Sequence, residues 1–225
     1  MMKEQSAASS RRGFLAGVGS VVTAGLLAGC SSLDEALSFE AQPATVPPAV
    51  LEQTGYREDT VVPQTIQQSF NVAGISQTVV VTNWQAEYSK SVSLPGIDLP
   101  GQQPLALFSL LATPRVDLLG RSFNPVGGWS AEEIATEIQA QYDGLEGLEP
   151  HGSSTIEILG QSTTVTMFKG DGRFGLPIDI ELTIHISEAV EAGDDFVIAL
   201  CGYPAATDDI EETHVQTLLE SVQHG

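Results

Sequence analysis

Asp179, Glu181 and His185 are the residues of this sequence whose types and spacing come nearest to a chemical site. They alternate with isoleucine and leucine between residues 178 and 187, and side chains two residues apart lie on one face of a strand. Two carboxylates and an imidazole on one face can hold a divalent cation if a neighbouring strand adds a ligand. The alternative is a half-solvated antiparallel strand of an acidic protein, and we favour that interpretation over a metal site.

Other patterns that are typical of functional sites in proteins have structural interpretations in this sequence. Residues 170–175 match G-x-G-x-x-G, but Pro177 and a strand follow instead of the helix that a dinucleotide site needs, so we interpret them as a hairpin loop. Cys201 lies in an apolar run and is interpreted as an inert core thiol. His214 is expected to be a partly buried packing residue, and His224 to lie in a frayed terminus. The sequence has no nucleophile elbow, P-loop or metal-binding histidine pair, so we predict no catalytic residue and no cofactor.

The first thirty residues have the pattern of an export signal. Arg11 and Arg12 precede an uncharged run over residues 13–29, as in a twin-arginine signal, and the run is shorter than the roughly 20 residues that span a bilayer. It ends in Leu-Ala-Gly-Cys, which looks like a lipobox whose cysteine, Cys30, takes up lipid. An uncleaved anchor helix is the alternative. We predict a signal peptide over residues 1–29 and a lipid-anchored protein on the extracytoplasmic side of the cell membrane.

The charge of the chain limits which environments and which partners suit the protein. The whole chain has 9 Lys+Arg and 29 Asp+Glu, for a formal net charge of −20, and removal of residues 1–29 leaves 28 acidic against 6 basic residues. Nucleic-acid binding is excluded because phosphate recognition needs a basic surface. Scattered acids with almost no lysine resemble the surfaces of proteins from extreme halophiles. We therefore expect a fold that depends on high salt, where the screening length falls to about 3 Å at 1 M.

The rest of the chain is expected to form a tether over residues 30–50 and a single α+β domain over residues 51–225. A hairpin is expected around Gly74, and the apolar residues on both faces of the segment at 195–203 indicate a central strand. Strands are predicted over residues 65–72, 77–90, 105–113, 154–159, 163–169, 178–187 and 195–203. Because helices separate and follow these strands, we predict an antiparallel sheet with helices packed on it.

Two helices have N-terminal capping signals in the sequence. Ser130 and Glu133 have the spacing of a capping box, and Gly144 is the expected stop signal of that helix. Asp208 and Glu211 have the same spacing before the last apolar-periodic segment, so they are predicted to cap a C-terminal helix.

Four short motifs carry a resemblance to a known family. They are Gly55-Tyr56, Val81-Thr82-Asn83-Trp84, Thr113-Pro114 and Asn124-Pro125. With the closing strand and helix, they resemble a family of haloarchaeal lipoproteins of unknown function. The second half of the chain is also similar in layout to the PsbP-like α/β/α fold, whose members are mostly non-enzymatic accessory and assembly proteins. The resemblance implies an accessory role and supplies no catalytic residue.

These observations favour one function over two others. We expect a lipid-anchored, non-catalytic domain that contacts the bilayer through Cys30 and binds or assists another cell-surface or membrane protein. The first alternative is a lipoprotein that binds a small ligand or metal ion, with Asp179, Glu181 and His185 in its site. The second is a cell-surface hydrolase.

Overall fold

The computed structural model describes residues 36–72, 75–94, 104–118, 121, 122, 124–141, 144–173 and 178–225. These residues form a mostly β structure, 59% strand, with a mixed sheet of nine strands and three α-helices. The α+β class expected from the sequence is therefore confirmed. The segment with Arg11, Arg12 and Cys30 lies outside the described residues. Within the described part of the chain, no helix is both long and apolar enough to cross a membrane.

The nine strands of the main sheet are β1 (Leu37–Glu40), β3 (Arg57–Val72), β4 (Ile75–Ser91), β5 (Pro104–Pro114), β8 (Leu145–Ile158), β9 (Gln161–Gly172), β10 (Ile180–Ser187), β11 (Val190–Ala192) and β12 (Asp195–Pro204). Two small sheets pair β2 (Ala44–Thr45) with β13 (Gln223–His224), and β6 (Asp117–Leu118) with β7 (Arg121–Ser122). The helices are α1 (Pro48–Thr54), α2 (Ala131–Gln141) and α3 (Asp208–Glu220), with 3₁₀ turns over Pro125–Gly128 and Ala205–Thr207.

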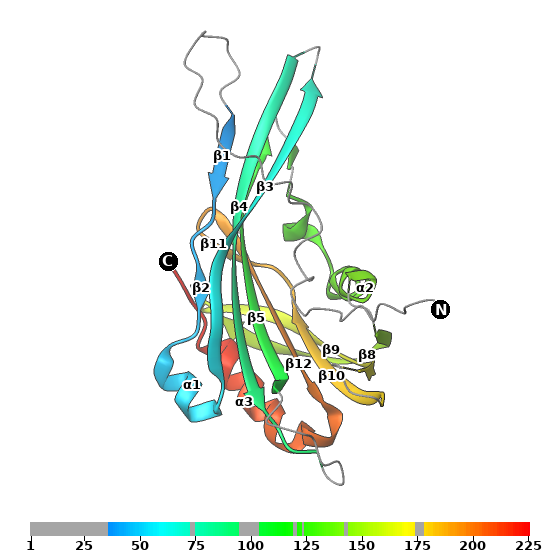
Figure 1. Cartoon of the computed structure of the whole chain (residues 1–225). Coiled ribbons are helices and arrows are strands. Elements are labelled where there is room, and N and C mark those ends of the chain that lie inside the picture. Colours follow the sequence, from blue (N-terminus) through cyan, green and yellow to red (C-terminus); the bar gives the residue numbers. More distant parts are fainter. Residues whose placement is uncertain are drawn as a thin grey trace, which may run out of the picture. The chain divides into compact units, whose positions relative to one another are not determined.

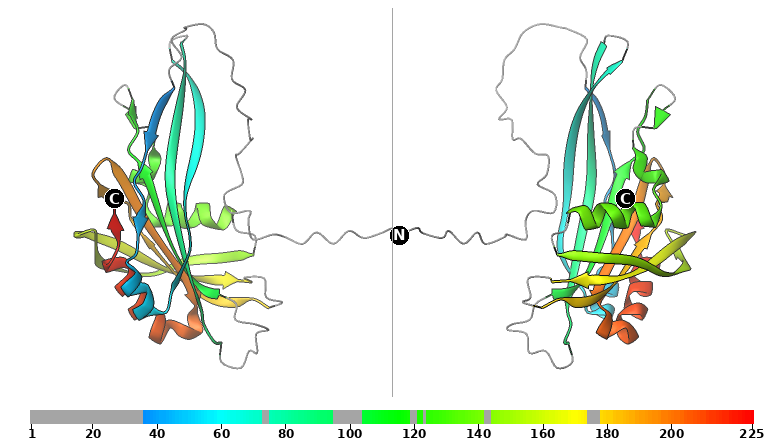
Figure 2. Two further views of the ribbon diagram at one scale, coloured as in Figure 1. Left: turned by 60° about the vertical axis from the view of Figure 1, so that its left-hand side comes forward. Right: turned by 90° about the vertical axis from the view of Figure 1, so that its right-hand side faces the viewer.

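The main sheet runs in the order β3, β4, β5, β12, β10, β9, β8. Strand β1 adds beside β4, and β11 adds beside β12. Every pair is antiparallel except β1 with β4, and this single parallel pair makes the sheet mixed. The predicted antiparallel sheet is thus correct for all strands but the first. In Figures 1 and 2, α2 lies on one side of the sheet and α1 and α3 on the other.

Each face of the sheet has its own apolar core. On one face, α2 packs through Ile134 and Ile138 against the isoleucines of β10. On the other face, α3 packs through Val215 and Leu218 on side chains of β12 and β5, with Tyr88 fully buried among them. The sheet is therefore a central layer with helices on both sides, which is why its middle strands are apolar on both faces.

The middle strands test two expectations from the sequence. Strand β12 lies between β5 and β10 and is buried on both faces, so its prediction as a central strand is confirmed. The half-solvated face predicted for β10 is wrong, because Thr183, His185 and Ser187 are all buried. These polar side chains are satisfied by protein groups instead of water: Thr183 donates to Asp208, and Ser187 accepts from the backbone N–H of Ala199. Helix α3 and the turn before it cover the face that the alternation assigned to solvent.

The predicted tether extends too far into the domain. Residues 37–40 form β1, residues 44 and 45 form β2, and α1 begins at Pro48. Ala41, Ala44 and Val46 are buried in the core. The backbone N–H of Val46 donates to the hydroxyl of Tyr88 at 3.0 Å. The domain boundary therefore lies before residue 37, not at residue 51.

The capping box predicted for α2 is confirmed. The backbone N–H of Glu133 donates to the Ser130 hydroxyl at 3.2 Å, and the backbone N–H of Ser130 donates to the Glu133 carboxylate at 2.8 Å. These reciprocal bonds satisfy two amide groups that a helix start leaves without a partner. Gly144 has a φ of 89°, a left-handed conformation that favours glycine after the helix.

The first three residues of the G-x-G-x-x-G segment, residues 170–172, lie within a strand instead of the expected loop, and residues 174 and 175 lie outside the described residues. Its first glycines end β9, which pairs antiparallel with β10. Gly170 lies against a bulge in β8, where a Cβ atom would be 2.8 Å from the carbonyl oxygen of Glu146. Glycine is needed at this position for packing, so the first glycine of the motif has a structural explanation.

The β3–β4 hairpin predicted around Gly74 is confirmed by the pairing of its strands and continues beyond the rest of the sheet, while Gly74 itself lies outside the described residues. Strand β5 pairs with β4 only from Trp84 onward. Residues 64–72 of β3 and 75–83 of β4 therefore form a two-stranded arm, with β1 beside residues 79–82 (Figure 1). Cross-strand hydroxyl pairs, Thr65 with Thr82 and Ser69 with Thr78, each 3.2 Å apart, join its strands.

Candidate functional site

The structure does not assemble the metal site that the sequence left as an alternative for Asp179, Glu181 and His185. Asp179 forms an ion pair with Arg173, and both side chains are more than half exposed. Glu181 is exposed at the surface of β10, whereas His185 is buried and bonds to Tyr203. Among the residues that the structure describes, no group of three or more His, Cys, Asp or Glu side chains could hold a metal ion.

A chelator is expected to leave the melting temperature of the purified protein unchanged in high-salt buffer. The reason is that each member of the predicted trio already has a different protein partner or faces solvent. Thermal melts with and without EDTA, together with metal analysis of the purified protein, check this expectation. A fall of several degrees with EDTA, reversed by a divalent cation, would contradict it.

His185 and Tyr203 form a buried pair beneath α3. The imidazole Nε2 lies 2.9 Å from the Tyr203 hydroxyl, and the two rings stack with their centroids 5.7 Å apart. Burial lowers the pKa of His185 below its ordinary value because it disfavours the imidazolium, and the nearby charge of Asp208 opposes this in part. Burial also raises the pKa of Tyr203. Both groups are therefore neutral at neutral pH.

This pair gives the fold a pH dependence with a definite sign. Unfolded histidine takes up a proton below a pH of about 6.5, whereas the buried His185 resists protonation, so the unfolded state gains stability as the pH falls below that value. We expect the melting temperature in fixed high salt to fall between pH 7.5 and pH 5.5, and to fall less in His185→Gln. His151→Gln, at an exposed position, is the control. An identical pH profile for wild type and His185→Gln would contradict the assignment.

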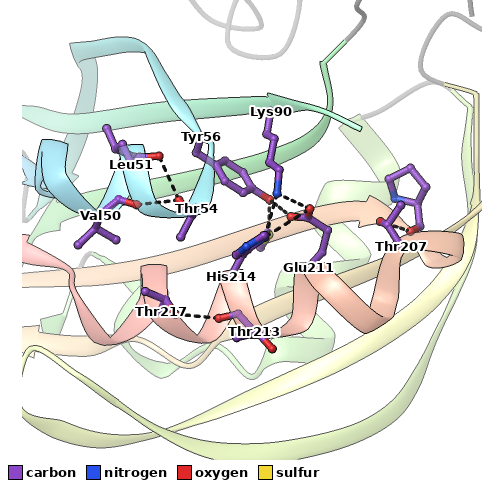
Figure 3. Close-up of polar contacts among 12 residues, drawn as sticks. Val50, Leu51, Thr54, Tyr56, Lys90, Thr207, Glu211, Thr213, His214 and Thr217 are labelled. Carbon is purple, nitrogen blue, oxygen red and sulfur yellow. Dashed lines mark hydrogen bonds and ion pairs between the residues drawn. The ribbon is translucent and has the colours of Figure 1, made fainter. Parts of the chain in front are cut away.

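A second buried polar group, which sequence reasoning did not find, lies where α3 meets the ends of β3 and β4 (Figure 3). We call it the α3 cluster and define it by Tyr56, Lys90, Glu211 and His214. The Lys90 ammonium is 2.6 Å from Oε1 of Glu211 and 2.8 Å from Nδ1 of His214. The Tyr56 hydroxyl donates to Oε2 of Glu211 at 3.1 Å. Glu211 is only 1% exposed, so its charge is compensated inside the protein.

The acids at the start of α3 were predicted to cap the helix, and this prediction is wrong. Their side chains instead bind groups on the strands against which the helix packs. The residue before the helix is Thr207, whose side chain makes no capping bond. Asp208 accepts from Thr183 at 2.7 Å and pairs with Lys169, while Glu211 pairs with Lys90. Glu211 precedes Val215 and Leu218 by four and seven residues, and these are apolar-face positions of a helix. The sequence therefore carries two signals of this buried pair: an acid at an apolar-face position of the last helix, and only two lysines after residue 29.

The α3 cluster holds the fold together instead of presenting a reactive group. Burial raises the pKa of the Tyr56 phenol and of the Cys201 thiol, which lie 3.9 Å apart. Neither the phenolate nor the thiolate is therefore available near neutral pH. Cys201 is confirmed as a buried free thiol. As Figure 3 shows, the side chains of the cluster point toward one another and connect the start of β3 and the end of β4 to α3.

The C-terminus is fixed, which corrects its expected fraying. Strand β13 pairs with β2, and Nε2 of His224 lies 3.0 Å from a carboxylate oxygen of Asp195. The same oxygen accepts from the backbone N–H of Gln42 at 2.8 Å. Asp195 is 5% exposed, so these donors compensate a buried carboxylate. His224 therefore joins the last residues of the chain to its first strands.

Three of the motifs that carried the family resemblance meet in one hydrogen-bond network. The Asn124 amide donates to the Thr113 hydroxyl at 2.8 Å and to the Pro114 carbonyl at 2.7 Å. Thr113 in turn donates to the side chain of Asn83 at 2.7 Å. The network connects β4, β5 and the 3₁₀ turn at Pro125. These motifs therefore have a structural role at the base of the arm.

A small cavity lies beside the turn that precedes α3. Its volume is about 340 Å³, and its lining is mostly apolar: Leu94, Ile180, Pro204, Ala205 and Ala206, with Lys169 and Glu181. Of the predicted trio, only Glu181 reaches it. The volume is at the lower end of the range for small-ligand sites, roughly 300–1,000 Å³.

The arm belongs to a long uncharged stretch of this acidic chain. Residues 60–86 contain no Asp, Glu, Lys or Arg. Ile66 on the arm is 48% exposed, and Val62 at its base is 41% exposed. Among the described residues, β3 pairs only with β4, so the outer edge of β3 presents free backbone groups. The arm thus combines exposed apolar side chains with an unpaired strand edge.

The opposite edge strand, β8, shows how this protein protects an edge. It exposes Glu146, Glu149 and Glu157, contains Pro150, and has two irregularities in its pairing with β9. Charges, proline and bulges are the usual devices that prevent another strand from pairing with an edge. In β3 the corresponding features, the charged residues 57–59, a bulge and Pro63, all lie before the arm. The arm is therefore an unprotected edge of the sheet.

The described residues form an α+β domain with an exposed, uncharged arm. The chain belongs to the family described as a domain of unknown function (DUF6517), whose model matches residues 43–223. No curated protein matches the sequence. Among solved structures, the chain is similar to PA94 from Pseudomonas aeruginosa, a protein of unknown function described as a candidate regulator. The identity is 13%, the TM-score is 0.30, and the match covers 69% of this chain and 94% of that one.

Proposed function

We propose that this protein is a lipid-anchored, non-catalytic domain of a halophile that binds another cell-surface or membrane protein through its arm. The observation that carries the proposal is the unprotected outer edge of β3 in an otherwise charged chain. An extended segment of a partner can add to such an edge by main-chain hydrogen bonds, with Ile66 giving apolar contact.

The absence of charge on the arm lowers the cost of binding. Burying a charge in an interface costs free energy unless a partner compensates it, and this cost persists in high salt. Residues 60–86 contain no charged side chain, so burying them in an interface does not carry this cost. The protein therefore concentrates solubilising acids on its body and keeps one neutral surface for contact.

The anchor and the accessory role are parts of the same proposal. The Arg11-Arg12 pair and Cys30 support export and lipidation, and the scattered acids support a haloarchaeal origin. The PsbP-like layout proposed for the second half of the chain fits a role that assists another protein. The α3 cluster is compatible with this role, because its polar groups are used in packing.

The test compares two lysine substitutions at exposed isoleucines. Ile66→Lys places a charge on the arm, whereas Ile210→Lys places the same charge on α3, where Ile210 is 60% exposed. After purification from membranes in high salt, the wild type and Ile210→Lys are expected to retain a specific partner. Ile66→Lys is expected to bind that partner about tenfold more weakly or worse, which corresponds to a loss of at least about 1.4 kcal/mol of binding free energy. Equal retention by both variants would contradict the proposal.

The anchor has its own test and control. Cys30→Ser is expected to release the protein from the membrane fraction, because the lipid attaches to that thiol. Cys201→Ser should stay in the membrane fraction, since Cys201 is a buried residue of β12. Membrane retention of Cys30→Ser would overturn the anchor.

A second candidate function is small-ligand binding in the cavity beside α3. Its mostly apolar lining and two charged groups, Lys169 and Glu181, favour a small molecule with a polar end. Ligand screening by thermal shift, with Glu181→Gln as the comparison, would separate this function from protein binding.

A further inference from the structure

The cavity beside α3 has two charged groups of opposite sign that do not pair with each other. Lys169 and Glu181 both line it. Glu181 lies directly opposite Asp171 in the pairing of β10 with β9, so Lys169, two residues before Asp171, is its diagonal neighbour on the same face of the sheet. Diagonal neighbours lie about 7–8 Å apart. Among the described residues, the ion pair of Lys169 is with Asp208 and not with Glu181.

The positive group is held in place by other protein groups. The Lys169 ammonium donates to Oδ2 of Asp208 at 3.2 Å, and Oδ1 of Asp208 accepts from the Thr183 hydroxyl at 2.7 Å. An ammonium has three N–H donors, so this bond leaves two of them for another acceptor. The Lys169 side chain is 28% exposed and is therefore accessible to a ligand.

The negative group lacks such a partner. Glu181 is exposed, and within the described part of the chain its side chain makes no hydrogen bond or ion pair. It faces Asp171, which is also exposed, and like charges directly opposite each other on two strands repel. A positive group of a ligand beside Glu181 lowers this repulsion, whereas a second anion raises it.

The remaining lining is apolar and limits the size of a ligand. Leu94 and Ile180 belong to the core on the α2 face of the sheet, and Pro204 ends β12. The cavity volume of about 340 Å³ corresponds to about eleven water molecules at roughly 30 Å³ each. A ligand that fits therefore has about that many non-hydrogen atoms or fewer, with an apolar part against this wall.

We infer that the cavity binds a small zwitterion with an apolar side chain, of the chemical class of the α-amino acids. The ligand carboxylate accepts from Lys169, its ammonium donates to Glu181, and its side chain contacts Leu94 and Ile180. A ligand with only a positive charge is repelled by Lys169, and one with only a negative charge is repelled by Glu181. The inference rests on the small-ligand function proposed for this cavity and does not depend on the arm.

The test compares three probes with the same apolar part. They are leucine, isopentylamine, which is leucine without its carboxylate, and isocaproate, which is leucine without its amino group. Calorimetric titration and thermal melts of the purified protein are carried out in fixed high salt at neutral pH. Leucine is expected to raise the melting temperature in a saturable way and to bind about tenfold more tightly than either analogue, because each analogue leaves one charged group of the cavity without a partner.

Two variants exchange the selectivity of the cavity, and a third is the control. Glu181→Gln should bind leucine about tenfold more weakly and isocaproate as tightly as leucine, since the ammonium then has no carboxylate to meet. Lys169→Met should do the same for isopentylamine. Glu157→Gln, an exposed position on β8 outside the cavity, should keep the selectivity of the wild type. Loss of a purely structural role would weaken all three probes alike.

The outcomes separate this inference from the other proposals. Binding of isopentylamine or isocaproate to the wild type as tightly as leucine would overturn the inference and leave a small-ligand site in place. Unchanged leucine binding in both Glu181→Gln and Lys169→Met would overturn the assignment to this cavity. No saturable binding of any probe would overturn the inference together with the small-ligand function. Partner retention by the wild type and Ile66→Lys tests the arm independently of all three results.

Discussion

Replacing Lys90 with methionine is expected to lower the free energy of unfolding by about 3–5 kcal/mol. The substitution leaves the carboxylate of Glu211, which is 1% exposed, without the cation that lies 2.6 Å away. Removing one member of a buried ion pair costs about this much because the other charge stays uncompensated in the interior. Denaturant unfolding in high salt measures the change.

The other lysine that pairs with α3 provides a matched control. Lys169 pairs with Asp208 at 3.2 Å, but the two side chains are 28% and 36% exposed, and exposed pairs contribute only about 0–1 kcal/mol. Lys169→Met should therefore cost much less than Lys90→Met. Equal losses in the two variants would contradict the account of the α3 cluster.

A double substitution identifies the cause of the loss. In Lys90→Met/Glu211→Gln the buried group is a neutral amide that can still accept from Tyr56. Most of the stability lost in Lys90→Met should return, because the uncompensated charge is gone. If the double variant is as unstable as the single one, the loss comes from the packing of Lys90 and not from its charge.

Transfer of the protein from about 1 M to about 0.1 M salt is expected to abolish its cooperative thermal unfolding. Among the described residues, five Lys or Arg side chains each pair with one carboxylate: Arg57 with Asp59, Lys90 with Glu211, Arg115 with Glu191, Lys169 with Asp208 and Arg173 with Asp179. These pairs account for five of the 28 acids after residue 29. The screening length rises from about 3 to 10 Å over this change, so the remaining acids repel one another in dilute buffer.

Melts over a salt series measure this dependence, and a variant of β8 tests its electrostatic origin. Glu146, Glu149 and Glu157 are exposed on one strand, so their joint replacement by glutamine removes three charges with little loss of packing. The variant should keep its cooperative transition to lower salt than the wild type. A melting temperature that does not change with salt in the wild type would refute the halophilic interpretation.

Local patterns in the sequence were enough to predict much of the fold. The capping box at Ser130 and Glu133, the β3–β4 hairpin and the central strand β12 depend on neighbouring residues or on periodicity within one segment. These signals are short-range, so a single sequence carries them in full. The α+β class follows from the order of such segments.

The elements that sequence reasoning missed depend on contacts between distant residues. Strand β1 has four residues and pairs with β4 some 42 positions away, and β2 pairs with the last residues of the chain. Glu211 is buried because Lys90, which lies 121 positions earlier, reaches it. The covered face of β10 was misjudged for the same reason: polar side chains such as His185 are satisfied by partners that alternation cannot reveal.

The arm could have been found from the sequence by its missing charges. A run over residues 60–86 without Asp, Glu, Lys or Arg stands out in a chain that is 17% charged. What the sequence could not show is that β5 ends its pairing at Trp84 and leaves the outer part of the hairpin without a further strand. The proposal that the arm binds a partner therefore depends on the sheet order.

Photocrosslinking in living cells tests most directly whether the arm binds a partner. A photoreactive amino acid is placed at Gln67 on the arm or at Ile210 on α3, both exposed, and the protein is crosslinked in its high-salt membrane. Purification and mass spectrometry then identify the products. We predict one protein crosslinked from Gln67 at near-equal stoichiometry and none from Ile210. No product from Gln67, or the same products from both positions, would contradict the arm as the binding surface.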